Sequence, residues 1–356
     1  MKRIFLYALG SVCVLLFSSA ALEAGNLRVL IVDGQNNHDW RETTRATRAT
    51  LLAAGRFDVD VTTTPKKKAS LTDWAAWRPE FSDYDVIVSN YNGELWPQEV
   101  RRDFMAYVEA GGGVVMVHAA NNPFRDWPEF NQMIGLGWRS AELGRRVTID
   151  DGTGEVRFEG PGEGRGAGHG KQHPYVVKVR RPDHPIMKGL PVAWLHGKDE
   201  LYHGQRGPAE NMTVLSSAFS AEDTRGTGAH EPITWVIPYG RGRVVTTVLG
   251  HHWPGQEDFD ALHCVGFQTI LVRSTEWAAT QEVTLPIPQG FPTANAVSIV
   301  EPDKVSWTAA KSAEAAPRFT AGSCCDKAAK AGGACGHGCC KKARASGTVC
   351  VACNPR

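Results

Sequence analysis

Residues 84–118 read YDVIVSNYNGELWPQEVRRDFMAYVEAGGGVVMVH, and this stretch decides the fold. Its first part, 84–90, is a short apolar run rich in β-branched residues, which predicts a buried strand. Residues 97–110 predict a helix that has a proline in its first turn and ends at three glycines. The apolar run 114–117 predicts a second strand, which leads directly into His118. A strand, a helix and a strand in this order predict a parallel β-α-β unit.

The residues before this unit repeat the alternation. Residues 27–32 (LRVLIV) predict a buried strand, 40–54 a helix closed by Gly55, and 57–63 another strand. We therefore predict an α/β fold with a mostly parallel sheet and helices on both faces. Ligands of such sheets bind beyond the carboxyl ends of the strands. Those ends here carry the polar segments 33–39, 90–94 and 118–122.

The second half of the chain has weaker signals. Residues 151–170 are rich in glycine and predict a loop excursion. The sequence PYGRG, between the apolar runs 233–237 and 243–249, predicts a hairpin. Further strands are expected at 174–179 and 212–217, and a closing helix at 259–279.

Composition narrows the function classes. Of the 356 residues, 42% are hydrophobic and 22% charged, which excludes wholesale disorder. The formal net charge of +1 argues against a dedicated nucleic-acid binder. The 12 His and 11 Trp suit proton transfer, metal binding and sugar stacking, and they also serve as ordinary core residues.

The first residues predict export. Lys2 and Arg3 precede the apolar run 4–17 and then several small residues, the pattern of a secretory signal peptide over residues 1–24. The apolar run is too short to span a bilayer, which needs about 20 residues. A retained membrane anchor is the alternative. We expect a periplasmic or secreted protein with no membrane span after signal cleavage.

We expect the main domain to cover residues 25–282. Beyond Pro286 the chain is rich in Pro, Ala, Thr and Ser, so residues 283–323 are expected to form a linker. Residues 324–356 form a Cys-rich tail that holds seven of the nine cysteines.

The tail is an internal duplication. Residues 324–338 (CCDKAAKAGGACGHG) align with 339–353 (CCKKARASGTVCVAC) at an offset of fifteen. Neither unit has the large apolar residues for a core, so a cross-link must stabilise them. Disulfides and a thiolate-bound metal such as zinc both remain open, and an unstructured tail is the third possibility. The candidate metal ligands are Cys324, Cys325, Cys335, His337, Cys339, Cys340, Cys350 and Cys353.

Several motifs together resemble the ThuA-like (trehalose utilisation) family over roughly residues 27–280. They are HEPITW at 230–235, YGRGRV at 239–244, LGH at 249–251, GGG leading into His118, HPI at 184–186 and DELY at 199–202. The resemblance implies a flavodoxin-like fold similar to class I glutamine amidotransferases. In those enzymes a Cys nucleophile sits on a strand-to-helix elbow, where this chain has His118. Imidazole cannot replace that thiolate, so the chain is not expected to be a glutaminase. The tail is outside the family pattern.

The resemblance also implies a role in using trehalose or related glycosides, through 3-keto sugars made by a partner sugar 3-dehydrogenase. A ketone at C3 acidifies the C2 proton, and His118 is the expected base because an imidazole titrates near pH 6.5. His251 or Glu94 would protonate the leaving oxygen, and His38 or a bound metal would stabilise the enolate. The candidate substrate-binding residues are His38, Asn36, Trp40, Asn121, Asp199 and Glu231. His169, His173 and His203 are left without a role.

The cofactor is left open. His38, His118 and His251, joined by an Asp or Glu, would suit a divalent metal at the strand ends, and the tail is the other candidate zinc site. Two functions follow. The first is an exported enzyme, a hydrolase or lyase that cleaves a glycoside by His-based acid/base chemistry. The alternative is a non-catalytic sugar-binding or scaffold protein with a degenerate amidotransferase-like site and a metal-binding tail.

Overall fold

The computed structural model describes residues 26–308, 323–330, 335–345 and 350. The expected signal peptide, residues 1–24, and Cys353 lie outside the described residues. Among the described residues, no helix is long and apolar enough to cross a membrane.

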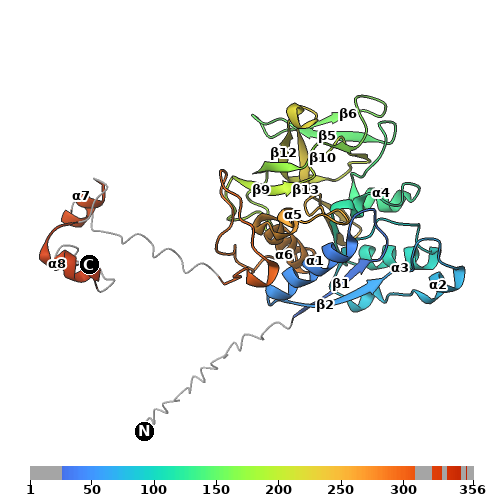
Figure 1. Ribbon diagram of the computed structural model, residues 1–356, viewed down its shortest axis with the longest axis horizontal. Coiled ribbons are helices and arrows are strands. Elements are labelled where there is room, and N and C mark those ends of the chain that lie inside the picture. Colours follow the sequence, from blue (N-terminus) through green and yellow to red (C-terminus); the bar gives the residue numbers. More distant parts are fainter. Residues whose placement is uncertain (1–25, 309–322, 331–334, 346–349, 351–356) are drawn as a thin grey trace, which may run out of the picture.

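A 12-stranded mixed sheet organises the domain, with a parallel half and an antiparallel half (Figure 1). The parallel strands lie in the order β2-β1-β3-β4-β14, so the predicted parallel arrangement is confirmed for this half. Their bounds are β1 (Leu27–Asp33), β2 (Phe57–Thr63), β3 (Val86–Ser89), β4 (Gly113–Val117) and β14 (Gly242–Thr247).

The sheet continues through antiparallel strands in the order β14-β13-β12-β8-β9, so it is mixed rather than mostly parallel. The predicted hairpin is confirmed, with Tyr239 of β13 paired to Gly242 of β14. The strand bounds are β13 (Ala229–Tyr239), β12 (Thr213–Ser220), β8 (His173–Val179) and β9 (Ala193–Asp199).

Short strands cover the region where the sequence predicted a loop, residues 151–170. The glycine-rich composition did not reveal them: β6 forms a local hairpin with β5, whereas β7 pairs with β10, which is distant in sequence. The strands within this region are β6 (Val156–Glu159) and β7 (Gly168–His169). The other short strands are β5 (Arg145–Ile149), β10 (Tyr202–His203) and β11 (Arg206–Gly207).

Helices cover both faces of the sheet, as predicted, because alternate side chains of the central strands enter two separate cores. Val29 and Ile31 of β1 pack in one core with residues of α1 and α6. Leu30 and Val32 pack in the other core, with residues of α2, α3 and α4. The helices are α1 (Trp40–Ala53), α2 (Leu71–Ala76), α3 (Gln98–Glu109), α4 (Pro128–Ile134), α5 (Asp260–His263) and α6 (Val265–Thr280). Four 3₁₀ turns are η1 (Phe81–Asp83), η2 (His118–Asn121), η3 (Glu222–Thr224) and η4 (Pro302–Lys304).

The packed domain extends beyond residue 282, where composition predicted a linker. Leu285, Ile287 and Phe291 pack against the core of α1 and α6, and Val305 and Trp307 are buried in it. These apolar residues are widely spaced among Pro and polar residues, so their pattern has no helix or strand period. The described part of the expected linker, residues 283–308, is therefore part of the domain. Two helices, α7 (Cys324–Lys330) and α8 (Gly338–Ala345), form the described tail.

Arg273 of α6 ties this extension to the domain. It is 5% exposed, and its guanidinium donates hydrogen bonds to four backbone carbonyls, those of Pro185, Ile186, Lys188 and Leu285.

We predict that Arg273→Met lowers the free energy of unfolding by about 3 kcal/mol, because it leaves buried carbonyls without donors. Urea denaturation measures the change. Arg181→Met, which removes an exposed ion pair with Asp183, is the control and should cost less than about 0.5 kcal/mol. Equal losses in the two variants would contradict this assignment.

Candidate metal centre

Three histidines from separate strand ends meet at the carboxyl edge of the parallel half. His38 follows β1, His118 follows β4 directly, and His251 follows β14. Their ring centroids lie 4.8 Å (His38 to His118), 5.0 Å (His38 to His251) and 5.3 Å (His118 to His251) apart. The structure therefore brings together three residues that are far apart in the sequence and that were singled out from it.

A carboxylate from the antiparallel half completes the group. Glu200 follows β9, and its carboxylate oxygen lies within 4.8 Å of a ring nitrogen of each of the three histidines, which lie equally close to one another. We define His38, His118, His251 and Glu200 as the His₃Glu group. Sequence reasoning named Glu200 only as part of the polar run 199–202. Nothing local marks it as a partner of residues 38 and 118.

His118 adopts an uncommon backbone conformation. Its φ is +47°, in the left-handed region that a residue with a side chain seldom occupies. The residue lies between the last residue of β4 and a 3₁₀ turn, so the turn directs its side chain over the sheet edge. Such conformations persist only where surrounding structure enforces them, and they cluster at functional sites. The strained elbow expected at this position is present.

Hydrogen bonds orient the rings so that Nδ1 faces the protein and Nε2 faces the other ligands. Nδ1 of His118 donates to the Val248 carbonyl at 2.7 Å, and Nδ1 of His38 donates to Oδ1 of Asn36 at 3.1 Å. A protonated Nδ1 leaves a lone pair on Nε2. This use of Nδ1 is the outer-shell arrangement common for metal-bound histidines.

The inward-facing nitrogens lack hydrogen-bond partners. Nε2 of His38, His118 and His251 is buried, and none accepts or donates a hydrogen bond within the described part of the chain. A Glu200 oxygen lies 3.5 Å from Nε2 of His251. Buried polar atoms are costly to leave unsatisfied, so three at one point indicate a missing ligand.

Asp199 holds this arrangement in place. Its buried carboxylate accepts hydrogen bonds from the backbone amides of Gly250, at 2.9 Å, and His251, at 3.2 Å. It also accepts from the Glu200 amide and from Nε2 of His196. Asp199, expected to bind substrate, instead positions two members of the His₃Glu group.

Comparison with known proteins identifies the family. The family model described as ThuA, trehalose utilisation, matches residues 28–278. The chain belongs to the ThuA family. The tail and its cysteines lie outside the matched residues.

One solved structure supports this assignment. A ThuA-like protein from Parabacteroides merdae is 40% identical, with a TM-score of 0.74, over 78% of this chain and 99% of that protein. A ThuA-like protein from Bacteroides uniformis is 20% identical, with a TM-score of 0.47, over 75% of this chain and 97% of its own. The glutaminase domain of Trypanosoma brucei CTPS also matches, at 11% identity and a TM-score of 0.34, over 79% of this chain and 98% of that domain. A comparison with curated proteins finds no significant match.

Burial sets the electrostatics of the His₃Glu group in this ThuA domain. Burial lowers the pKa of His118 to about 3 and that of His38 to about 4, and it also lowers the pKa of His251. All three imidazoles are therefore neutral near pH 7. Burial, followed by the charge of Asp199, raises the pKa of Glu200 to about 8. A bound cation would favour the ionised carboxylate, so neutral imidazoles and one carboxyl suit a divalent metal such as zinc.

A cavity of about 630 Å³ is lined by residues that flank His38 in the sequence, and none of the four members of the His₃Glu group is among its lining residues. It is lined by amides, charged side chains and one indole, including Gln35, Asn36, Asn37, Trp40, Arg41 and Glu94. Asn36 connects the cavity to the His₃Glu group. It lines the cavity, and its Oδ1 accepts a hydrogen bond from Nδ1 of His38. Two of the expected sugar-binding residues of the ThuA domain, Asn36 and Trp40, therefore share one cavity.

Three other predicted site residues are not members of the His₃Glu group. Glu94 lines the cavity and accepts a hydrogen bond from the Lys68 amide. Asn121 is buried, and its amide donates to the carbonyl of Leu136 and to Gln205. Glu231 is buried in an ion pair with Arg146. The side chains of Asn121 and Glu231 already have structural partners. The fold brings these partners together, so the sequence alone does not reveal them.

The paired residues His251 and His252 test the metal centre. His251 belongs to the group, whereas His252 is equally buried but stacks on Phe259, at 4.6 Å between ring centroids. We predict that His251→Ala weakens binding of one divalent ion by at least about 100-fold, since even outer-shell changes cost 10- to 100-fold.

His252→Ala is the matched control and should retain that ion. The measurement is elemental analysis of the zinc-loaded chain after dialysis, together with titration calorimetry. Retention of the ion by both variants would contradict the assignment of the site.

Proposed function

We propose that this ThuA-family chain is a metal-dependent enzyme that cleaves trehalose or a related glycoside after the sugar has been oxidised at C3. Membership in the trehalose utilisation family supports the sugar class. The His₃Glu group supports metal-assisted chemistry, and Asn36 connects His38 of this group to the cavity. The convergence of three unpartnered Nε2 atoms on one carboxylate is the observation that carries this proposal.

The chemistry needs a base near C2 and stabilisation of charge at C3. A base removes the C2 proton, the electron pair forms the C1–C2 double bond, and the C1–O bond to the leaving sugar breaks. The departing oxygen then takes up a proton. A divalent cation at the His₃Glu group would supply Lewis-acid stabilisation of the oxygen at C3.

The geometry changes the role proposed for His118. Its Nε2 lies among the other ligand atoms, and its lowered pKa makes it a weak base. A ligand role therefore fits His118 better than that of the general base. His251, first considered as the acid, takes the same ligand role, as does His38.

His169 takes the place of the general base. Nδ1 of His169 lies 3.4 Å from a Glu200 oxygen, and its side chain is 35% exposed, unlike the four members of the His₃Glu group. Nδ1 donates to the Gly170 carbonyl at 2.8 Å, which leaves the lone pair on Nε2. His169 is thus a partly exposed imidazole at the edge of the group, as a proton-transfer residue requires.

The cavity supports a sugar as the substrate. Its volume falls in the range of about 300–1,000 Å³ typical of small-molecule sites. Asn36, Asn37 and Glu94 offer hydrogen bonds to hydroxyl groups, and Trp40 offers an aromatic face. Glu94 remains the candidate for protonating the leaving oxygen.

We also propose that the chain works outside the cytoplasm, downstream of a sugar 3-dehydrogenase. The charged and apolar pattern of residues 1–24 supports export. Cleavage through a 3-keto intermediate requires a separate oxidation step, because the proposed elimination is redox-neutral.

One observation favours the alternative, a non-catalytic sugar-binding protein. The members of the His₃Glu group are at most 5% exposed, as expected for a closed structural metal site. Binding without turnover would identify this alternative.

Replacement of His169 separates catalysis from metal binding. We predict that His169→Ala lowers kcat on a 3-keto glycoside by about 100-fold or more while the chain keeps its metal, because the base is lost and the ligands remain. Product formation is followed by NMR with trehalose, 3-keto-trehalose and simple glycosides as the panel.

His173→Ala is the matched control, since His173 follows His169 by four residues and its Nδ1 donates a hydrogen bond to the Lys171 carbonyl at 2.8 Å. It should keep wild-type turnover. Saturable binding of these sugars without any product from the metal-loaded wild type would overturn the enzymatic proposal.

A further inference from the structure

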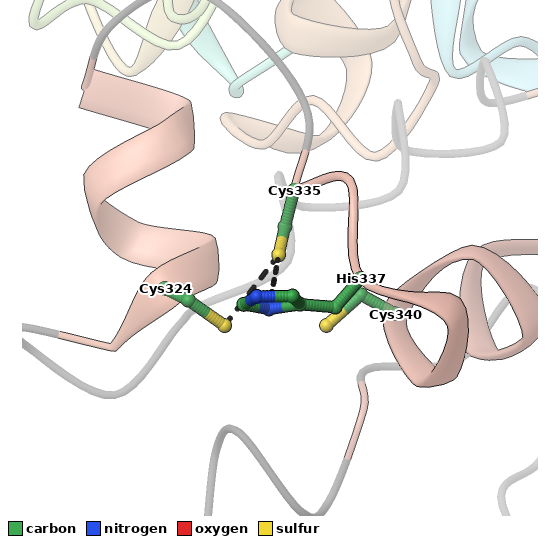
Figure 2. A group of neighbouring side chains, drawn as sticks. All are labelled: Cys324, Cys335, His337 and Cys340. Atoms are coloured by element: carbon green, nitrogen blue, oxygen red, sulfur yellow. Dashed lines mark hydrogen bonds between the residues drawn. The ribbon is translucent and has the colours of Figure 1, made fainter.

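The two units of the Cys-rich tail meet at a second group of metal-binding side chains. Cys324 begins α7, Cys335 and His337 lie in the segment before α8, and Cys340 lies in the first turn of α8. Figure 2 shows the three cysteine side chains pointing toward the ring of His337. One ligand atom from each residue lies within 4.8 Å of the others. We call these four residues the Cys₃His group.

The spacing of the atoms matches metal coordination. Sγ of Cys335 lies 3.5 Å from Sγ of Cys324 and 3.3 Å from Nδ1 of His337. Two sulfurs bound to one tetrahedral zinc lie about 3.8 Å apart, and a sulfur and a nitrogen about 3.6 Å apart, given the usual bond lengths. A disulfide needs about 2.05 Å, so the Cys324 and Cys335 sulfurs are too far apart for that bond.

We propose that Cys324, Cys335, His337 and Cys340 bind one Zn²⁺ ion that joins the two repeated units of the tail. The three thiols release their protons to solvent when the ion binds, and no oxidation or reduction is involved. Cys324, Cys335 and His337 come from the first unit and Cys340 from the second, so the ion cross-links the duplication.

The composition of the tail requires such a cross-link. Residues 324–356 contain only two aliphatic residues larger than Ala, Val349 and Val351. In the described tail, the buried apolar cluster consists of the sulfur side chains of Cys325, Cys340 and Cys350. A segment with so small a core depends on a metal or covalent link for its structure.

The charge of the tail also favours bound thiolates. Residues 324–356 carry six Lys or Arg and a single acidic residue, Asp326. Three thiolates and one zinc ion carry a net charge of −1, which the surrounding positive side chains offset. A second trio, Cys339, Cys340 and Cys350, shares Cys340 with the Cys₃His group but contains no fourth ligand among the described residues. The complete tetrahedral set is therefore the Cys₃His group.

Sulfur ligation makes the site distinguishable from the His₃Glu group. The full-length chain is loaded with Co²⁺, and thiolate-to-cobalt charge transfer is recorded in the near ultraviolet. Only a site with sulfur ligands gives this band. We expect the band in the wild type and its loss in Cys335→Ser, with loss of one equivalent of zinc per chain by elemental analysis. The wild type and Cys335→Ser are expected to differ by one zinc ion per chain whether or not the His₃Glu group also binds metal.

Cys339→Ser is the matched control, because Cys339 is exposed and lies outside the Cys₃His group. It should keep both the band and the zinc equivalent. The proposal is overturned if Cys335→Ser retains the charge-transfer band, if Cys339→Ser loses it equally, or if mass spectrometry of the alkylated wild type finds Cys324, Cys335 and Cys340 in disulfides. The thermal unfolding temperature of the domain is measured in both variants. If it is unchanged, loss of the band reports a local loss of metal and not misfolding of the chain.

Discussion

The buried carboxylate of Asp199 joins the two halves of the sheet where the candidate metal ligands meet. It ends β9 in the antiparallel half and accepts hydrogen bonds from the backbone of Gly250 and His251, beyond the end of β14 in the parallel half. Burial alone would lower the pKa of His196, but Cys264 and Asp199 raise it to about 10, so a charged donor accompanies the carboxylate. These bonds fix the backbone of His251 and of Glu200 relative to each other. The centre therefore depends on one linking side chain as much as on its four ligands.

Local sequence patterns predicted the parallel half closely. The apolar runs 27–32 and 114–117 became β1 and β4, and the helix expected at 97–110 became α3, because strand and helix periods are local properties. The short strand β7 escaped prediction because it pairs with β10, which is distant in sequence. The strand β6 escaped it because it is a four-residue arm of a local hairpin with β5, next to a glycine-rich segment. Residues 283–308 were expected to be a linker for a similar reason. Their anchors, such as Phe291 and Trp307, are spaced without a period.

The site residues also fall into those that local sequence patterns predict and those that they do not. The histidines 38, 118 and 251 were found in sequence because each follows a strand of the parallel half, and such strand ends share one edge. Glu200 belongs to the antiparallel half, whose placement no local pattern reveals. Glu231 was predicted as a substrate ligand, and the structure places its carboxylate in an ion pair with Arg146, 85 residues away, which the sequence alone does not reveal. The two metal groups also differ in chemistry. Nitrogen and oxygen ligands at a sheet edge suit catalysis, whereas sulfur ligands suit a structural link in a tail without a core.

The central claim is that His38, His118, His251 and Glu200 hold one divalent metal ion. Anomalous diffraction from crystals of the zinc-loaded protein, collected on both sides of the zinc absorption edge, tests it most directly. We expect an anomalous peak about 2.0–2.2 Å from the three Nε2 atoms and from the Glu200 carboxylate. A map with well-ordered rings, a peak in the tail and only water at the centre of the His₃Glu group would contradict it.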